Sequence, residues 1–103
     1  MIDICKSIRN KILDIIYNAR ASHLGSSMSV VEILTAVYES VDCNKILTGD
    51  NFRSRVFVSK GHAAAATYAT MNHFGLISDD NLNTYHKNDS VLCGHVSHKV
   101  DNV

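Results

Sequence analysis

The 103-residue chain contains no proline, so all its turns are formed by other residue types. No apolar run approaches the roughly 20 residues that a helix needs to span a bilayer. The N-terminus also lacks a basic region followed by an apolar stretch, which excludes an obvious secretory signal. Neither sign of charge is in excess, because ten basic residues balance ten acidic ones. We therefore expect no binding to nucleic acid or to a membrane.

Cysteines are few: Cys5, Cys43 and Cys93 are odd in number and widely spaced. This pattern argues against a disulfide framework and for a reducing, cytoplasmic location. With 46% apolar and 19% charged residues, the composition is typical of a soluble globular protein. The length predicts one small domain over residues 1–103, with little stability to spare.

Apolar periodicity predicts two helices in the first half of the chain. The first has a single apolar stripe from Ile4 and ends near Ala21. The second follows Ser29, which stands three residues before Glu32 as in a capping box. Residues 42–54 are polar and without period, so we expect a loop there.

The second half begins with a short apolar run, Val56–Val58, which predicts a strand buried on both faces. A turn then leads into a third helix, Ala63–Phe74, capped by Gly75. Its alanines at 63–66 make it thin, so a neighbour can approach closely. A short fourth helix is predicted from Ser78, and residues 88–103 are expected to be mostly irregular.

A single strand cannot form a sheet, because its N–H and C=O groups need partners on both sides. The strand, turn and helix over residues 56–74 are typical of one unit of a parallel sheet. The pattern therefore predicts an α/β fold: the helix-rich part of a parallel-sheet domain that is incomplete in this chain.

Three of the six histidines, His23, His62 and His95, lie within two positions of a glycine at predicted breaks between elements. Glycine permits close approach of the backbone to a ligand. Imidazole can donate to a phosphate or sugar hydroxyl and can move a proton near neutral pH. His73 and His86 carry no such signal. His95 and His98 are spaced as His-x-x-His, but two histidines without a third ligand are poor evidence for a metal site.

Three motifs in order resemble those of transketolases. Residues 22–34 contain Ser-His-Leu-Gly, a serine-rich turn and an amphipathic helix. Residues 54–63 read Ser-Arg-Val-Phe-Val-Ser-Lys-Gly-His-Ala, similar to the strand and turn of that family. Residues 75–95 supply Gly, Asp-Asn-Leu and Ser-Val-Leu-Cys-Gly-His. The resemblance covers nearly the whole chain, and the Ser-Lys-Gly-His form favours transketolase over deoxyxylulose-phosphate synthases.

The resemblance assigns roles by position. His62, with Gly61 beside it, would contact the diphosphate of thiamine diphosphate, where a helix N-terminus favours an anion. His23 and His95 would be catalytic, bonding sugar hydroxyls and assisting proton transfer. Some positions depart from the usual family pattern without altering these histidines: Ser22, Leu24, Asp89 and Val96.

The resemblance also implies parts that this sequence lacks. In the family a glycine-rich loop and a Gly-Asp-Gly motif with a downstream asparagine hold magnesium and, through it, the diphosphate. The sequence has neither, so no metal ligand is assigned within it. The glutamate that activates the cofactor lies in a later domain of the family.

We therefore expect a truncated or split transketolase segment that is inactive alone. The resemblance implies that it belongs to a transferase of carbohydrate metabolism, of the kind that acts in the pentose phosphate pathway. The parent enzyme would move two-carbon ketol units between sugar phosphates with thiamine diphosphate and magnesium. The partner would be the remainder of the enzyme or a C-terminal subunit, in a dimer or hetero-oligomer. Two alternatives stay open: a non-catalytic module contacting a partner through the alanines at 63–66, and a thiamine enzyme of different sugar specificity.

Overall fold

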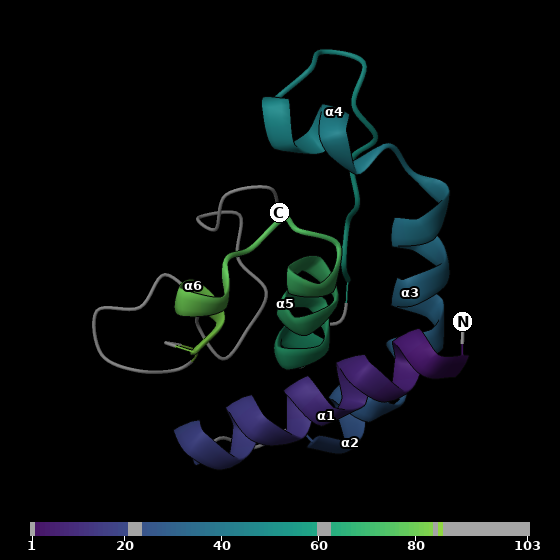
Figure 1. The fold of residues 1–103 in the computed structure, drawn as a ribbon. Helices are drawn as coiled ribbons and strands as arrows, with labels where there is room; N and C mark the ends of the chain where they lie inside the picture. The colour runs from purple at the N-terminus through teal and green to yellow at the C-terminus, as the bar shows by residue number, and fades with distance from the viewer. Residues whose placement is uncertain (1, 21–23, 60–62, 84, 86–103) are drawn as a thin grey trace.

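A computed structural model describes residues 2–20, 24–59, 63–83 and 85 of the chain. This part contains six helices in chain order: α1 (Ile2–Ala19), α2 (Leu24–Met28), α3 (Val31–Ser40), α4 (Cys43–Thr48), α5 (Ala64–His73) and α6 (Asp79–Asn83). Helix α5 packs against α1, α2, α3 and α6, and Figure 1 shows it among them.

Helix α5 is the centre of the core, with nine of its ten residues buried. Its first turns are built from alanine, and the side chains of residues 63–66 are at most 2% exposed. Because these side chains are short, neighbouring helices can approach α5 closely: α1, α2 and α3 all pack against it. The prediction of a thin helix with close neighbours is confirmed. Its buried hydroxyls are satisfied within the helix, since Thr70 Oγ1 donates to the Ala66 carbonyl at 2.7 Å.

Helices α1 and α3 each bury one apolar stripe against α5, as the periodicity predicted. Ile8 and Ile12 of α1 are fully buried. Tyr38 of α3 stacks on Phe74 with ring centroids 6.2 Å apart. Burial raises the pKa of Tyr38 to about 12, so its hydroxyl stays protonated at physiological pH. The buried stripe residues of the two helices are Cys5, Ile8, Ile12, Ile15, Ile16, Val31, Leu34, Thr35 and Tyr38.

The ends of α5 and α6 also follow the sequence signals. Gly75 follows Phe74, the C-cap of α5, and has a left-handed backbone with φ +82°, which a glycine adopts without strain. Its N–H donates to the Asn72 carbonyl at 3.1 Å. Ser78 precedes α6, and its hydroxyl accepts from the Asn81 N–H at 3.2 Å.

The expected loop over residues 42–54 is wrong in part, because α4 occupies residues 43–48. Asp42 caps this helix by accepting from the N–H groups of Asn44 at 3.0 Å and Lys45 at 3.3 Å. Gly49 ends it with φ +70°. An aspartate before a helix and a glycine after it are ordinary helix-boundary signals. The helix was missed because so short a segment shows no apolar periodicity.

The predicted capping box at the start of α3 is also wrong. The N-cap residue is Val30, which makes no side-chain cap hydrogen bond. The Ser29 hydroxyl donates instead to the Ser26 carbonyl at 3.1 Å. The Glu32 carboxylate accepts from Arg9 of α1. Glu32 therefore forms an ion pair with another helix instead of the predicted cap at the start of α3.

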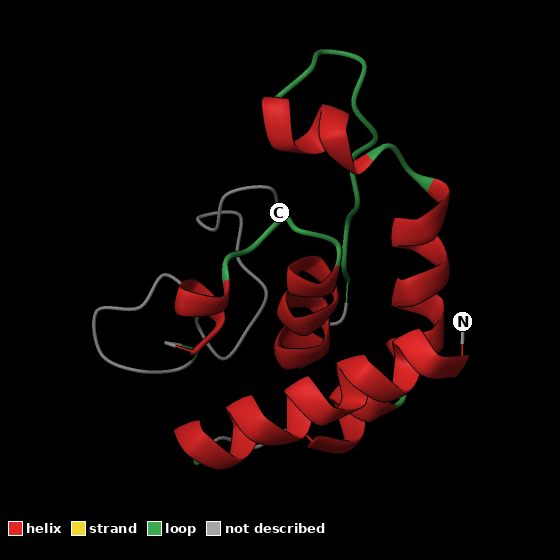
Figure 2. Cartoon of the chain, viewed as in Figure 1, coloured by secondary structure: helices red, strands yellow, loops and turns green. Residues whose placement is uncertain are grey.

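The predicted strand at 56–58 does not form as such, and the described residues contain no strand (Figure 2). Residues 53–59 carry no regular secondary structure. Phe57 is 85% exposed, so this segment is not buried on both faces. The physical reason is that a strand is defined by paired neighbours, and no described segment supplies them. The parallel sheet stays a prediction.

No helix in the described ranges is long and apolar enough to cross a membrane.

Candidate functional site

All four residues assigned from the sequence, His23, Gly61, His62 and His95, lie outside the described residues. The structure does describe the chain that follows two of them. Helix α2 begins at Leu24, directly after position 23. Helix α5 has its N-cap at Ala63, directly after position 62. The geometry of the candidate site is therefore built from these two flanks.

The two flanks are joined by a buried hydrogen bond. The Ser27 hydroxyl oxygen of α2 accepts from the Ala66 N–H of α5 at 3.3 Å. Ser27 is only 1% exposed. Position 27 lies four residues after the first assigned histidine and position 66 four residues after the second. The bond therefore ties together the segments that follow the first two motifs.

This bond replaces a missing local cap. The first N–H groups of a helix have no intrahelical acceptor, and a polar N-cap side chain commonly satisfies one of them. The N-cap of α5 is Ala63, which has no such side chain and makes no cap hydrogen bond. The hydroxyl of Ser27, in another helix, instead accepts the N–H of Ala66, the third residue of α5. Sequence reasoning missed Ser27, and its one signal was an alanine at a helix start.

The alanines at 63–66 are all within the core, at 0–2% exposure. The proposal that a partner docks on their face is therefore wrong for this structure. Their short side chains are buried inside the chain, in the helix against which α1, α2 and α3 pack. A partner must use another surface.

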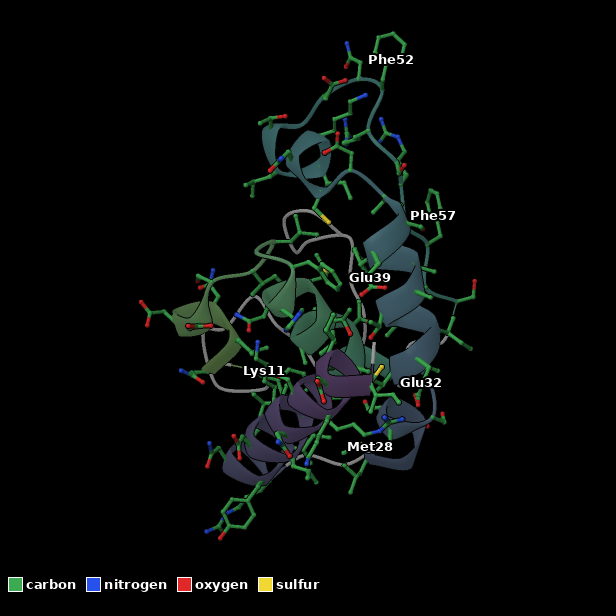
Figure 3. The ribbon with its side chains drawn as sticks, turned by 45° about the vertical axis from the view of Figure 1, so that its right-hand side comes forward. Lys11, Met28, Glu32, Glu39, Phe52 and Phe57 are labelled. Carbon is green, nitrogen blue, oxygen red and sulfur yellow. The ribbon has the colours of Figure 1, made fainter. Side chains whose placement is uncertain are left out.

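An ion pair fixes the far end of α2. Arg9 of α1 contacts both carboxylate oxygens of Glu32, with Nη2 to Oε2 at 2.6 Å. The same Nη2 donates to the Met28 carbonyl, the last residue of α2, at 3.3 Å. Figure 3 shows Met28 and Glu32 close together at the start of α3. Hydrogen bonding to Arg9 holds the pKa of the Glu32 carboxyl below its usual range.

A second polar cluster joins α1, α5 and α6. Lys11 Nζ donates to Asn72 Oδ1 at 2.8 Å. The Asn72 amide nitrogen donates to the Ile77 carbonyl at 2.9 Å and to Asp79 Oδ1 at 2.7 Å. Asn72 is 8% exposed and both of its amide N–H groups are used, so the cluster orients helices and leaves Asn72 no free donor for a ligand.

His73, beside this cluster, behaves as an ordinary helix residue. Its ring meets Phe74 edge-on, with centroids 5.2 Å apart. Burial, assisted by the charge of Lys11, lowers the pKa of His73, while Glu39 opposes that shift. The imidazole is therefore mainly neutral at pH 7. The two other histidines given no role, at positions 86 and 98, lie outside the described residues.

The start of α5 has the chemistry that an anion requires. Its first turn contains no acidic side chain, and the positive end of the helix dipole lies there. A diphosphate held by residue 62 would therefore meet no carboxylate from this turn. Metal ligands are a different matter, because the described ranges contain no group of three or more His, Cys, Asp or Glu side chains that could hold an ion.

Comparison with known proteins identifies the family to which this sequence is related. The profile of the family described as the thiamine diphosphate binding domain of transketolase matches residues 2–103. A protein from Actinobacillus succinogenes, named as one subunit of an apulose-4-phosphate transketolase, is 40% identical over 101 residues, which are 95% of this chain and 37% of that protein. A protein of the same name from Phocaeicola vulgatus is 32% identical over 98 residues, covering 92% of this chain and 34% of its own length.

The chain thus spans roughly a third of the length of these two curated relatives, at 34% and 37%. No solved structure matches it. The family profile covers both motif segments that Ser27 and Ala66 join, together with every described helix. By this match over almost its whole length, the chain belongs to the transketolase family, in its thiamine-diphosphate-binding domain.

Proposed function

We propose that this chain is one part of a split transketolase-like transferase that moves a two-carbon ketol unit between sugar phosphates. Family membership supports thiamine diphosphate as the cofactor. The relatives are each named as one subunit of an apulose-4-phosphate transketolase, which supports a second polypeptide and a phosphorylated ketose as substrate. The chain covers 34% and 37% of the length of these two relatives.

The observation that carries this proposal is the bond between Ser27 and Ala66. A common cofactor and substrate site requires the first two histidine motifs to lie beside one another. Helices α2 and α5 follow these motifs directly and pack together, and Ser27 of α2 caps the start of α5. This arrangement supports a common site for His23 and His62.

Within that site we assign His62 and Gly61 to the diphosphate. Support comes from the start of α5, which offers a helix N-terminus free of acidic side chains. His23 and His95 are assigned to the sugar, where they hold hydroxyl groups and move protons at the substrate oxygens. Thiamine diphosphate supplies the carbanion chemistry when bound. The chain contributes binding, orientation and proton transfer.

Magnesium is assigned to residues other than those that the structure describes. It prefers six oxygen ligands in octahedral geometry, and the described residues offer no cluster of that kind. Under this proposal the assembled enzyme is a cytoplasmic hetero-oligomer of carbohydrate metabolism. We also propose that the enzyme is a dimer and that it acts in pentose phosphate metabolism.

Complementation tests this function directly. The purified chain is mixed with a polypeptide carrying the uncovered part of the A. succinogenes relative and with the second subunit that the relative's name implies. Thiamine diphosphate, magnesium, a ketose phosphate donor and an aldose phosphate acceptor are added, and the ketose product is measured by mass spectrometry. We expect turnover only in the complete mixture.

The controls separate the alternatives. Omission of any one polypeptide should abolish product formation. Turnover by this chain alone would contradict the split assignment. Stable binding without turnover in the complete mixture would instead support the non-catalytic module.

A further inference from the structure

Helix α2 is too short to hold its own position. It has five residues, Leu24–Met28, and an isolated helix of that length is not stable in water. Its position therefore depends on neighbouring elements. Besides packing on α1 and α5, it has two side-chain hydrogen bonds to other helices, one from Ser27 to α5 and one from Arg9 of α1 to Met28.

The Arg9 contact completes the C-terminal end of α2. The last carbonyl groups of a helix have no intrahelical donor. The chain itself supplies donors to two of them, because the N–H of Ser29 reaches the Gly25 carbonyl and its hydroxyl reaches the Ser26 carbonyl, each at 3.1 Å. The Met28 carbonyl accepts instead from Nη2 of Arg9, at 3.3 Å. An arginine is well suited to this place, since it can donate to the last carbonyls of a helix and carries the charge that the helix dipole favours there.

The same nitrogen atom of Arg9 also contacts both carboxylate oxygens of Glu32, in the first turn of α3. One guanidinium group therefore joins α1, the end of α2 and the start of α3, where Figure 3 shows Met28 and Glu32 together. The side chains of Arg9 and Glu32 are 36% and 55% exposed. Ion pairs with this much exposure add little to the free energy of unfolding. What the contact does is fix the junction between α2 and α3.

We propose that Arg9 is a positioning residue of the enzyme, which holds α2 so that His23 meets the sugar phosphate. Helix α2 begins directly after position 23, and its five residues rise only about 7 Å. A helix of fewer than two turns moves as one body, so releasing its end at Met28 shifts its start as well. Ser27 has a different role, because it caps the helix that follows His62. This inference rests on the proposed function, in which His23 binds the sugar and His62 the diphosphate.

Arg9→Met and Arg53→Met form a matched pair of variants. Arg53 also donates to carbonyl groups after a short helix, those of Gly49 at 3.2 Å and Asp50 at 2.9 Å. That helix is α4, which lies at the top of Figure 1, whereas α2 lies at the bottom. Each substitution therefore removes a guanidinium group from the end of a short helix, and only Arg9→Met releases α2.

The complemented enzyme gives the readout. Arg9→Met should lower kcat/KM for the ketose phosphate at least about tenfold, because misplacing a catalytic group by a fraction of an ångström is costly. The dissociation constant of thiamine diphosphate should change less than about twofold, because Ser27 still caps α5. Arg9→Lys keeps the charge but loses the planar fork, so its loss should be intermediate. Arg53→Met should leave both quantities within about twofold of wild type.

A double-mutant cycle with His23→Asn shows whether Arg9 acts through this histidine. His23→Asn alone should lower kcat/KM, and adding Arg9→Met should cause little further loss, because the side chain to be positioned is already gone. Full losses from both substitutions together, or normal kcat/KM in Arg9→Met, would overturn the positioning role. A large fall in the melting temperature of the Arg9→Met chain would overturn it too, since loss of an exposed pair should change that temperature by about 4 °C or less.

Two other results would contradict the proposed function itself. The first is a complemented wild-type enzyme without turnover, and the second is His23→Asn with full activity. Either result would also remove the basis of the role assigned to Arg9.

Discussion

Replacing Ser27 by alanine removes a single oxygen atom from a site that is 1% exposed. That oxygen accepts the Ala66 N–H at 3.3 Å, in the first turn of the central helix. Alanine keeps the size of the side chain nearly unchanged and is a better helix former than serine. The loss of the cap is therefore the main effect of the substitution.

The size of the effect follows from two known costs. Replacing a serine cap by alanine costs about 0.5–2 kcal/mol. A buried N–H left without an acceptor costs about 1–3 kcal/mol. We expect the free energy of unfolding to fall by about 1–2 kcal/mol, which for a domain of this size lowers the melting temperature by roughly 4–16 °C.

Urea denaturation followed by circular dichroism measures this change, and Ser26→Ala on the same helix is the matched control. Ser26 is half-buried, and its side chain makes no hydrogen bond with the described residues. Its substitution should alter the free energy of unfolding by less than about 0.5 kcal/mol. In the complemented enzyme, Ser27→Ala should also weaken thiamine diphosphate binding, because α2 and α5 follow the two motifs assigned to the site.

Equal stability of the two alanine variants would refute the cap. If Ser27→Ala lowered stability as expected but left cofactor affinity unchanged, the bond would be purely structural. The link between the two motif segments would then lose its main support.

Three further outcomes follow. Ile12→Ala should lower the free energy of unfolding by about 2–5 kcal/mol in urea, because Ile12 is fully buried, while Leu13→Ala, 47% exposed, should cost far less. The Glu32 carboxyl has its pKa lowered by Arg9, so its stabilisation is present above the ordinary value of 4.5 and is lost as pH falls through the lowered value. The stability difference between wild type and Glu32→Gln should therefore shrink below pH 4.5 in acid titrations; a constant difference would contradict the ion pair. His62→Asn should raise the thiamine diphosphate dissociation constant of the complemented enzyme roughly tenfold or more in calorimetry, and unchanged affinity would remove His62 from the diphosphate.

The helices that repeat their apolar spacing several times could be predicted from the sequence. The stripe on α1 places Ile8 and Ile12 in the core, and it was visible because a helix of that length repeats its spacing several times. The short helix α4 has room for too few repeats, so only its caps, Asp42 and Gly49, could have signalled it.

Contacts between elements could not be read in this way. The acid Glu32 fitted a local capping box, yet Arg9 from another helix engages it. The alanines at 63–66 fitted an exposed contact face, yet they are buried in the core. Local pattern names the residues that can make an interaction, and the spatial neighbours decide which one forms.

The order of the three histidine motifs, and the family it indicates, came from the sequence alone, because motif order and spacing are one-dimensional properties. The helical periods came from it for the same reason. Tertiary structure decided that Ser27 caps the helix beginning after position 62, since the two residues stand 39 positions apart and meet only through packing. It also decided that Phe57 stays open beside a main chain that no described residue pairs, because a strand is completed by its neighbours and not by its own residues.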